Sequence, residues 1–248
     1  MADILENYFE EGYYTCRFGK IHFMHRSGGG RSMVFLHGLG ADTGSWRKLM
    51  AYMAGDLDIY LVDLIGHGGS SMPLPGYTAM TQAAALEEFF KGYGIILPCL
   101  VGHSYGGWVA TLIASSGFPL SGLVLIDSAG LRAKLDDTIS SGDLEKTRSL
   151  LLKNALATGS NNPASMEAII GSMDKELLDL PLLANIHLPA LIIWGSADPL
   201  IAIGYSNYFK EGITGSRLSV VEGAGHSPQY THPGIVAKYI SEFLAGLR

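Results

Sequence analysis

A serine set among glycines near the middle of the chain most limits what this sequence can fold into. Residues 102–107 have the sequence Gly-His-Ser-Tyr-Gly-Gly. The apolar run over 94–101 predicts a buried strand before it, and the apolar run over 108–114 predicts a helix after it. The residue at the apex of such a turn adopts a strained backbone conformation, so its neighbours must be small. The pattern therefore predicts a nucleophile elbow, a strand-to-helix turn that presents Ser104 above the edge of a sheet.

Runs of strand length alternate with helical stretches along most of the chain. A β-hairpin is predicted at 13–18 and 21–25, with its turn at Gly19-Lys20. Buried strands are then predicted at 33–36, 59–63, 122–127, 190–195 and 217–221. Helices are predicted at 45–53, 78–93, 203–211 and from Pro233 to Leu247. This alternation predicts an α/β fold with a parallel sheet and right-handed crossovers.

Residues 131–185 interrupt this alternation, because they contain no strand-like run. Helices are predicted at 143–156, ended by Gly159, and from Pro163 to Met173, where Asn162 is the N-cap. We therefore predict a core domain formed by 1–130 and 186–248, with a helical cap at 131–185 inserted after the sixth strand. An independent helical domain is the alternative, but one of this size would be marginally stable alone.

Composition excludes several classes of function. The 248 residues are 48% hydrophobic and 16% charged with a formal charge of −6, which argues against disorder and against nucleic-acid binding. No apolar run has the length of a membrane span, and the acidic N-terminus does not resemble a signal peptide, so we expect a cytoplasmic protein. Cys16 and Cys99 are interpreted as buried thiols rather than a disulfide, and no metal-binding spacing of Cys and His is present.

Two polar residues that could activate Ser104 follow the last two predicted strands. Asp198 lies just after the strand at 190–195, and His226 lies in a glycine-rich loop just after the strand at 217–221. A serine is a poor nucleophile unless a base accepts its proton and a further group orients that base. Loops at the carboxyl ends of parallel strands meet at one edge of the sheet. We therefore predict Ser104 as the nucleophile, His226 as the base and Asp198 as the orienting acid.

Other residues could take parts of these roles. Asp127 ends the strand after the elbow and could also reach the histidine, whereas Asp63 ends a strand further away. Six other histidines are interpreted as structural: His22 and His25 in the hairpin, His187 and His232 before later elements, and His37 and His67 in loops.

An acyl-transfer site also needs two donors for the oxyanion. The backbone N–H of Tyr105 follows the nucleophile at the start of a helix, where the helix dipole adds to its effect. The loop at 37–40 follows the strand at 33–36, and we assign the second donor to the N–H of Leu39.

Five motifs together resemble the α/β-hydrolase superfamily: His-Gly-Leu-Gly at 37–40, Asp-Leu-Ile-Gly-His-Gly-Gly-Ser at 63–70, the elbow at 102–107, Trp-Gly-Ser-Ala-Asp-Pro at 194–199 and Gly-His at 225–226. The resemblance implies a mostly parallel eight-stranded sheet flanked by helices and a Ser-Asp-His hydrolase that needs no metal or organic cofactor. It also implies acyl transfer, with Ser104, Asp198 and His226 in the order typical of this superfamily. A serine at position 104 argues against relatives that open epoxides or remove halogens, which carry an aspartate there.

The superfamily resemblance leaves the substrate open. We favour a carboxylesterase that acts on a small-molecule ester with a small to medium acyl chain. The alternatives are a carbon–carbon bond hydrolase, a menaquinone-pathway lyase-type relative, a perhydrolase, or a non-catalytic ligand receptor. The cap and the loops at 64–65 and 200–201 offer apolar pocket walls. Arg132 and Lys134 are the only nearby cations and are interpreted as solvated surface charges, so no substrate-binding residue is assigned.

Overall fold

The computed structural model describes residues 4–72, 78–132, 141–157 and 161–247, and it describes no side chains over 141–148. Its strands are β1 (Glu10–Cys16), β2 (Gly19–Arg26), β3 (Ser32–Leu36), β4 (Asp58–Val62), β5 (Cys99–His103), β6 (Gly122–Ile126), β7 (Ala190–Gly195) and β8 (Arg217–Val221). Its helices are α1 (Ile4–Tyr8), α2 (Arg47–Met50), α3 (Ala79–Tyr93), α4 (Tyr105–Ser115), α5 (Ser141–Leu156), α6 (Pro163–Met173), α7 (Gly204–Gly212), α8 (Pro228–Thr231) and α9 (Pro233–Ala245), with short 3-10 helices η1 (Thr43–Trp46) and η2 (Leu180–Asn185).

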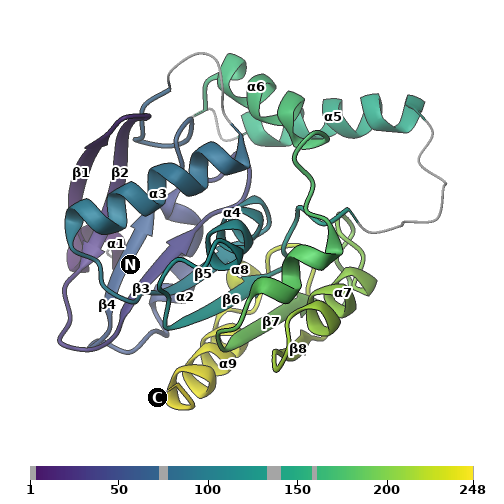
Figure 1. Cartoon of the computed structure of the whole chain (residues 1–248). Coiled ribbons are helices and arrows are strands. Elements are labelled where there is room, and N and C mark those ends of the chain that lie inside the picture. Colours follow the sequence, from purple (N-terminus) through teal and green to yellow (C-terminus); the bar gives the residue numbers. More distant parts are fainter. Residues whose placement is uncertain (1–3, 73–77, 133–140, 158–160, 248) are drawn as a thin grey trace.

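All eight strands form one sheet in the order β1-β2-β4-β3-β5-β6-β7-β8. β1 pairs with β2, and β2 with β4, in antiparallel register. Every later pair is parallel, with β5 between β3 and β6 near the centre of the sheet (Figure 1). The predicted mostly parallel eight-stranded sheet is therefore confirmed.

Apolar side chains fill both faces of the sheet, because alternate residues of a strand point to opposite sides. On β3, Val34 and Leu36 join the core cluster that contains residues of α3 and α4. Met33 and Phe35 join the second cluster, with residues of α2 and α9. The continuous apolar runs of the sequence are therefore strands covered on both sides, as expected of parallel strands. Figure 1 shows α3 lying across the near face of the sheet.

Two sequence predictions about strand ends are wrong. The hairpin turns at Arg17 and Phe18 rather than at Gly19-Lys20, because Gly19 already opens β2 with a φ of +135°. The strand predicted over 94–101 starts only at Cys99, and Ile96 before it is 77% exposed. Pro98 has no N–H to donate to a neighbouring strand, so the apolar run before it cannot continue the ladder.

The segment between β6 and β7 contains α5, α6 and η2, and Figure 1 shows α5 and α6 beyond the top of the sheet. The side chain of Asn162 caps α6 as predicted, accepting from the N–H groups of Ala164 and Ser165. Met166 and Ile169 of α6 are fully buried and belong to the same core cluster as α3 and α4. The predicted helix stop at Gly159 lies outside the described residues. The division into a core and a cap stays a prediction.

Cys16 and Cys99 are both buried and free, as predicted. Over the described parts of the chain, no helix combines the length and the apolar character that crossing a membrane requires.

Candidate active site

Ser104 lies between β5 and α4 with φ +51° and ψ −115°, a backbone conformation that residues with a side chain rarely adopt. Close packing explains the glycines around it. A Cβ on Gly102 would strike the backbone of Gly106 and Gly107, and a Cβ on Gly106 would strike the carbonyl oxygen of Leu36. The predicted strand-turn-helix is therefore present, and backbone contacts that leave no space for a side chain hold it in place.

The structure brings Ser104, His226 and Asp198 together. The Ser104 hydroxyl lies 2.9 Å from Nε2 of His226, and Nδ1 of His226 lies 2.7 Å from Oδ2 of Asp198. A hydrogen on Nδ1 donates to the carboxylate, which leaves Nε2 free to accept the serine proton. The loops after β5, β7 and β8 supply the three residues, and these strands end at the same edge of the sheet.

Asp198 is held as a carboxylate. Its Oδ1 accepts from the N–H groups of Leu200 and Ile201, at 2.8 and 3.0 Å. Burial alone would raise the pKa of Asp198, but the hydrogen bond from His226 and the two backbone donors outweigh it and hold that pKa below its ordinary value. An ionised carboxylate at this point is what orients an imidazole and stabilises its cation.

Asp127, the alternative acid, is also close to His226 but is bound differently. It directly follows β6 and has a φ of +42°, and its Oδ1 accepts from the N–H of Gly195 at 2.8 Å. Its Oδ2 is buried and has no partner among the described groups. Burial raises the pKa of Asp127 to about 7, and the nearby charge of Asp198 acts in the same direction. The hydrogen bonds therefore favour Asp198 over Asp127 as the partner of His226.

The loop after β3 approaches Ser104. A Cβ on Gly38 would lie 3.3 Å from Cβ of Ser104, so Leu39 follows a residue in contact with the serine. His37 braces this loop: its Nδ1 donates to the carbonyl of Gly38, and its Nε2 accepts from the N–H of Leu64. In the part of the chain that the structure describes, no acceptor takes the N–H of Leu39 or Tyr105. Both donors are therefore available, as an oxyanion site requires.

Asn161 ties the same loop to the helices between β6 and β7. Its Nδ2 donates to the carbonyl of Gly40 at 2.6 Å and to that of Ala155 at 3.0 Å. Gly40 has a φ of +73°, and a Cβ there would strike Ala155 on α5. Sequence reasoning missed this contact, because nothing in the local pattern links residues 121 positions apart.

His103 also escaped the sequence analysis, although it stands inside the elbow motif. Its Nε2 donates to the carbonyl oxygen of His226 at 2.6 Å, which fixes the loop that carries His226. Burial, together with the charge of His226, lowers the pKa of His103 to about 3, so this ring is neutral. The position of His103 directly before Ser104 was the one sequence feature that could have indicated this role.

Asp63 serves the neighbouring loops rather than His226. Its two oxygens accept from Nδ1 of His22 at 2.7 Å, from the N–H of Thr43 at 2.7 Å and from the N–H of Gly69 at 2.8 Å. Burial would raise the pKa of Asp63, but the His22 hydrogen bond and further contacts outweigh it and lower that pKa. Burial would lower the pKa of His22, but the interactions of His22 with Asp63 and Glu11 outweigh burial and raise that pKa. The hydrogen bonds of His22 agree with its interpretation as structural, and those of Asp63 join it to His22 and to the neighbouring loops.

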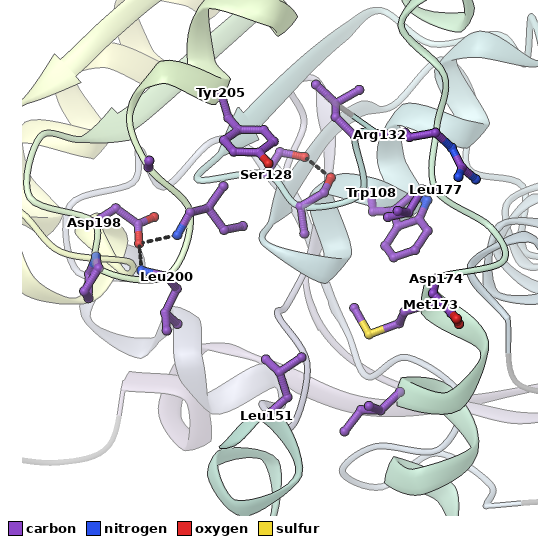
Figure 2. Close-up of a pocket in the computed structure, with 17 residues that line it drawn as sticks. Trp108, Ser128, Arg132, Leu151, Met173, Asp174, Leu177, Asp198, Leu200 and Tyr205 are labelled. Atoms are coloured by element: carbon purple, nitrogen blue, oxygen red, sulfur yellow. Dashed lines mark hydrogen bonds between the residues drawn. The ribbon is translucent and has the colours of Figure 1, made fainter. Parts of the chain in front are cut away.

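A cavity of about 520 Å³ lies beside Asp198 and under α5 and α6. Its wall is mainly apolar, with three charged residues, Arg132, Asp174 and Asp198 (Figure 2). Ser104 and His226 are not part of the wall, so Asp198 is the one predicted catalytic residue that borders this cavity. Arg132 forms an exposed ion pair with Asp179 at 3.2 Å, and Lys134 lies outside the described residues.

One group of residues offers atoms that a metal could bind. His103, Asp127 and His226 each place one such atom within 4.8 Å of the others. Both ring nitrogens of His226 and Nε2 of His103 already form hydrogen bonds, which a metal ion would have to displace. We assign no metal to this group, and the predicted independence from cofactors stays a prediction.

Comparison with known proteins identifies the family. A model of the alpha/beta hydrolase family matches residues 33–239, which include the elbow, Asp198 and His226. The chain belongs to the alpha/beta hydrolase family. The resemblance drawn from the five sequence motifs is confirmed.

Relatives of this hydrolase differ in their activities. It is 24% identical over 230 residues to Lipase 1 of Psychrobacter immobilis, covering 80% of this chain and 72% of the lipase. It is 38% identical over 109 residues to 2-succinyl-6-hydroxy-2,4-cyclohexadiene-1-carboxylate synthase of Salmonella agona, 42% of each chain. Its fold is similar to that of an esterase from Exiguobacterium antarcticum, with a TM-score of 0.86, 19% identity and coverage of 96% of this chain and 100% of the esterase.

Proposed function

We propose that this hydrolase is a serine esterase that cleaves carboxylic esters of small to medium acyl chains through an acyl-enzyme. The observation that carries the proposal is the unbroken chain of hydrogen bonds from the Ser104 hydroxyl through His226 to Asp198. The lowered pKa of Asp198 supports it, as do the N–H groups of Leu39 and Tyr105, which have no acceptor among the described residues.

The reaction has two halves. His226 Nε2 takes the hydroxyl proton of Ser104 as Oγ bonds to the ester carbonyl carbon, and the N–H groups of Tyr105 and Leu39 bind the oxyanion. The tetrahedral intermediate collapses, the bond to the alcohol oxygen breaks, and His226 gives its proton to the departing alcohol. Water then attacks the acyl carbon, again with His226 as base. This second attack releases the acid and regenerates Ser104.

The walls of the cavity favour uncharged, apolar substrates. Aliphatic side chains of the predicted cap form much of the wall: Leu131, Leu151, Ile170, Met173 and Leu177. Two of the three charged residues there are acidic, so a negatively charged substrate would be repelled. The lipase and esterase among the similar proteins agree with this substrate class.

A fluorophosphonate probe tests the nucleophile, since it reacts covalently with an activated serine. We expect the wild type to be labelled and Ser104→Ala to be unlabelled, and p-nitrophenyl esters of two to ten carbons to show a preferred chain length. A wild type that neither labels nor hydrolyses any ester would refute the proposal and favour a ligand receptor. Peroxide in place of water as acyl acceptor would identify a perhydrolase.

The 109-residue similarity to the Salmonella synthase supports a second candidate, a lyase-type or carbon–carbon bond activity on the same triad. Such substrates carry carboxylates and need positive charge in the pocket. Arg132 is the one cation in the described cavity wall, and it is paired with Asp179. Turnover of a vinylogous diketo acid, compared with the ester panel, separates the two activities.

A further inference from the structure

Trp108 belongs both to the helix that starts at the elbow and to the wall of the cavity beside Asp198. Its backbone N–H donates to the carbonyl of Ser104 at 3.1 Å, so it lies one turn further along the start of α4. Ser104 precedes α4 as its N-cap, and a rise of 1.5 Å per residue puts Trp108 about 6 Å further along the helix axis. The Trp108 side chain lines the cavity next to Asp198, and Figure 2 shows its indole among the wall residues near Met173 and Leu177. The indole therefore lies in the wall of the cavity that begins at Asp198, one helical turn from the elbow.

The indole N–H of Trp108 has no acceptor among the described groups, although the residue is only 1% exposed. Buried indole N–H groups usually find a partner. The other two tryptophans give a useful contrast. Trp194 donates from Nε1 to the carbonyl of Ile201 at 3.1 Å. Trp46 also lacks an acceptor, but it packs in the opposite core cluster against Phe35 and is not part of the cavity wall.

Packing fixes the Trp108 indole, so it cannot turn to find an acceptor elsewhere. A Cβ on Gly130 would strike the indole ring, which places the backbone of Gly130, with its φ of +103°, directly against it. The ring of Tyr105 packs edge-on at 5.9 Å and 80°. The donor is therefore preorganised rather than mobile.

The rest of the wall indicates which acceptor would fit. The Ser128 hydroxyl donates to the carbonyl of Ala129, and Tyr205 is partly exposed and can bond water. The carboxylates of Asp174 and Asp198 disfavour an anion nearby. A neutral oxygen, such as that of a ketone, ether or second ester, is therefore the acceptor that this apolar wall can take.

We propose that Trp108 is a specificity-determining residue, whose Nε1–H donates to a neutral oxygen on the substrate about one helical turn from the scissile carbonyl. The preferred substrates would then be esters with a second, uncharged oxygen on an otherwise apolar chain. This inference rests on the proposed esterase function, because it uses Ser104 to place the scissile bond.

Matched pairs of esters test the role of the Trp108 donor. The first pair is p-nitrophenyl hexanoate and p-nitrophenyl 5-oxohexanoate. The 4-oxo, 6-oxo and 7-oxo analogues of longer and shorter acids then locate the chain position at which the second oxygen helps most. We expect the wild type to favour one oxo ester over its plain counterpart by about 5- to 10-fold in kcat/KM, the usual effect of one hydrogen bond. Trp108→Phe removes the donor and should abolish this preference while lowering kcat/KM for the plain ester much less. Trp46→Phe, which removes an unpartnered indole outside the cavity, should leave the preference intact.

A second variant covers the possibility that Trp108→Phe does not fold. Replacing Trp108 with 3-benzothienyl-alanine keeps the ring shape and puts sulfur in place of N–H, so only the donor is lost. Equal losses on oxo and plain esters in both variants would assign Trp108 to packing alone. An oxo preference that neither variant changes, or no preference in the wild type, would overturn the proposal.

Binding separates this proposal from the proposed esterase activity. Calorimetry with Ser104→Ala compares methyl hexanoate with the methyl ester of the best oxo acid, without turnover. Tighter binding of the oxo ester that disappears in Ser104→Ala/Trp108→Phe supports the Trp108 donor even if the wild type hydrolyses neither ester. Hydrolysis of esters without any oxo preference in binding or turnover refutes the donor and leaves the esterase proposal standing.

Discussion

Asp127→Asn should change how the stability of this hydrolase depends on pH. Burial raises the pKa of Asp127 to about 7 in the folded protein, whereas the value for an exposed carboxyl is 3.8. Between these values the unfolded chain has lost the proton that the folded protein still holds. Rising pH therefore favours unfolding through this group, and its destabilising effect is complete above pH about 7.

The size of the effect follows from the two pKa values. At about 1.4 kcal/mol per pKa unit, the shift from 3.8 to about 7 corresponds to an unfolding free energy lower by roughly 4 kcal/mol at pH 8. Asparagine has the same shape, can still accept from the N–H of Gly195, and does not ionise. The stability of Asp127→Asn relative to wild type should therefore rise by that amount between pH 4 and pH 8.

Urea unfolding of both proteins at several pH values gives this difference directly. The difference is the useful quantity because His67 and His103, with pKa values lowered to about 3, impose a slope of the opposite sign on both proteins. Asp198→Asn is the contrast: the pKa of Asp198 is lowered, so the stability it provides is lost only as pH falls below about 4. A flat difference between Asp127→Asn and wild type from pH 4 to pH 8 would refute the reasoning.

Three further results are expected. Asp198→Asn should lower kcat about 10³- to 10⁴-fold in an ester assay, because the wrong tautomer of His226 then faces Ser104, whereas Asp127→Asn should change kcat less than tenfold. Asn161→Ala should lower the unfolding free energy by about 1–3 kcal/mol in urea, and kcat with it, because the carbonyls of Gly40 and Ala155 lose their donor. Gly130→Ala should cost about 1–3 kcal/mol in the same measurement, because its φ is +103° and a Cβ would strike Trp108.

The sequence was sufficient to predict the sheet and the proximity of Ser104, Asp198 and His226, because these depend on local patterns and one rule of topology. Apolar runs of strand length predict the strands, and residues just after parallel strands meet at one edge of the sheet. The Asn162 cap of α6 followed from two adjacent residues in the same way.

Contacts between distant loops could not be predicted. The bond from His103 to the carbonyl of His226 joins residues 123 positions apart, and the bond from Asn161 to Gly40 joins residues 121 positions apart. Each depends on how the loops pack once the sheet has formed, and a single sequence carries no signal for that. The start of β5 at Cys99 was missed because hydrophobicity alone does not register that Pro98 lacks an N–H.

The glycines of the elbow and its serine are subject to different physical constraints. Gly102 and Gly106 are required because backbone atoms occupy the space of their side chains, which is a condition for folding at all. Ser104 occupies the apex, where its hydroxyl has the proposed role of nucleophile. Under that proposal, a descendant of this protein could exchange the serine, lose catalysis and keep the fold, whereas exchange of either glycine would remove both. When relatives are compared, the two glycines therefore indicate whether the fold is shared, and only residue 104 indicates whether the proposed reaction is shared.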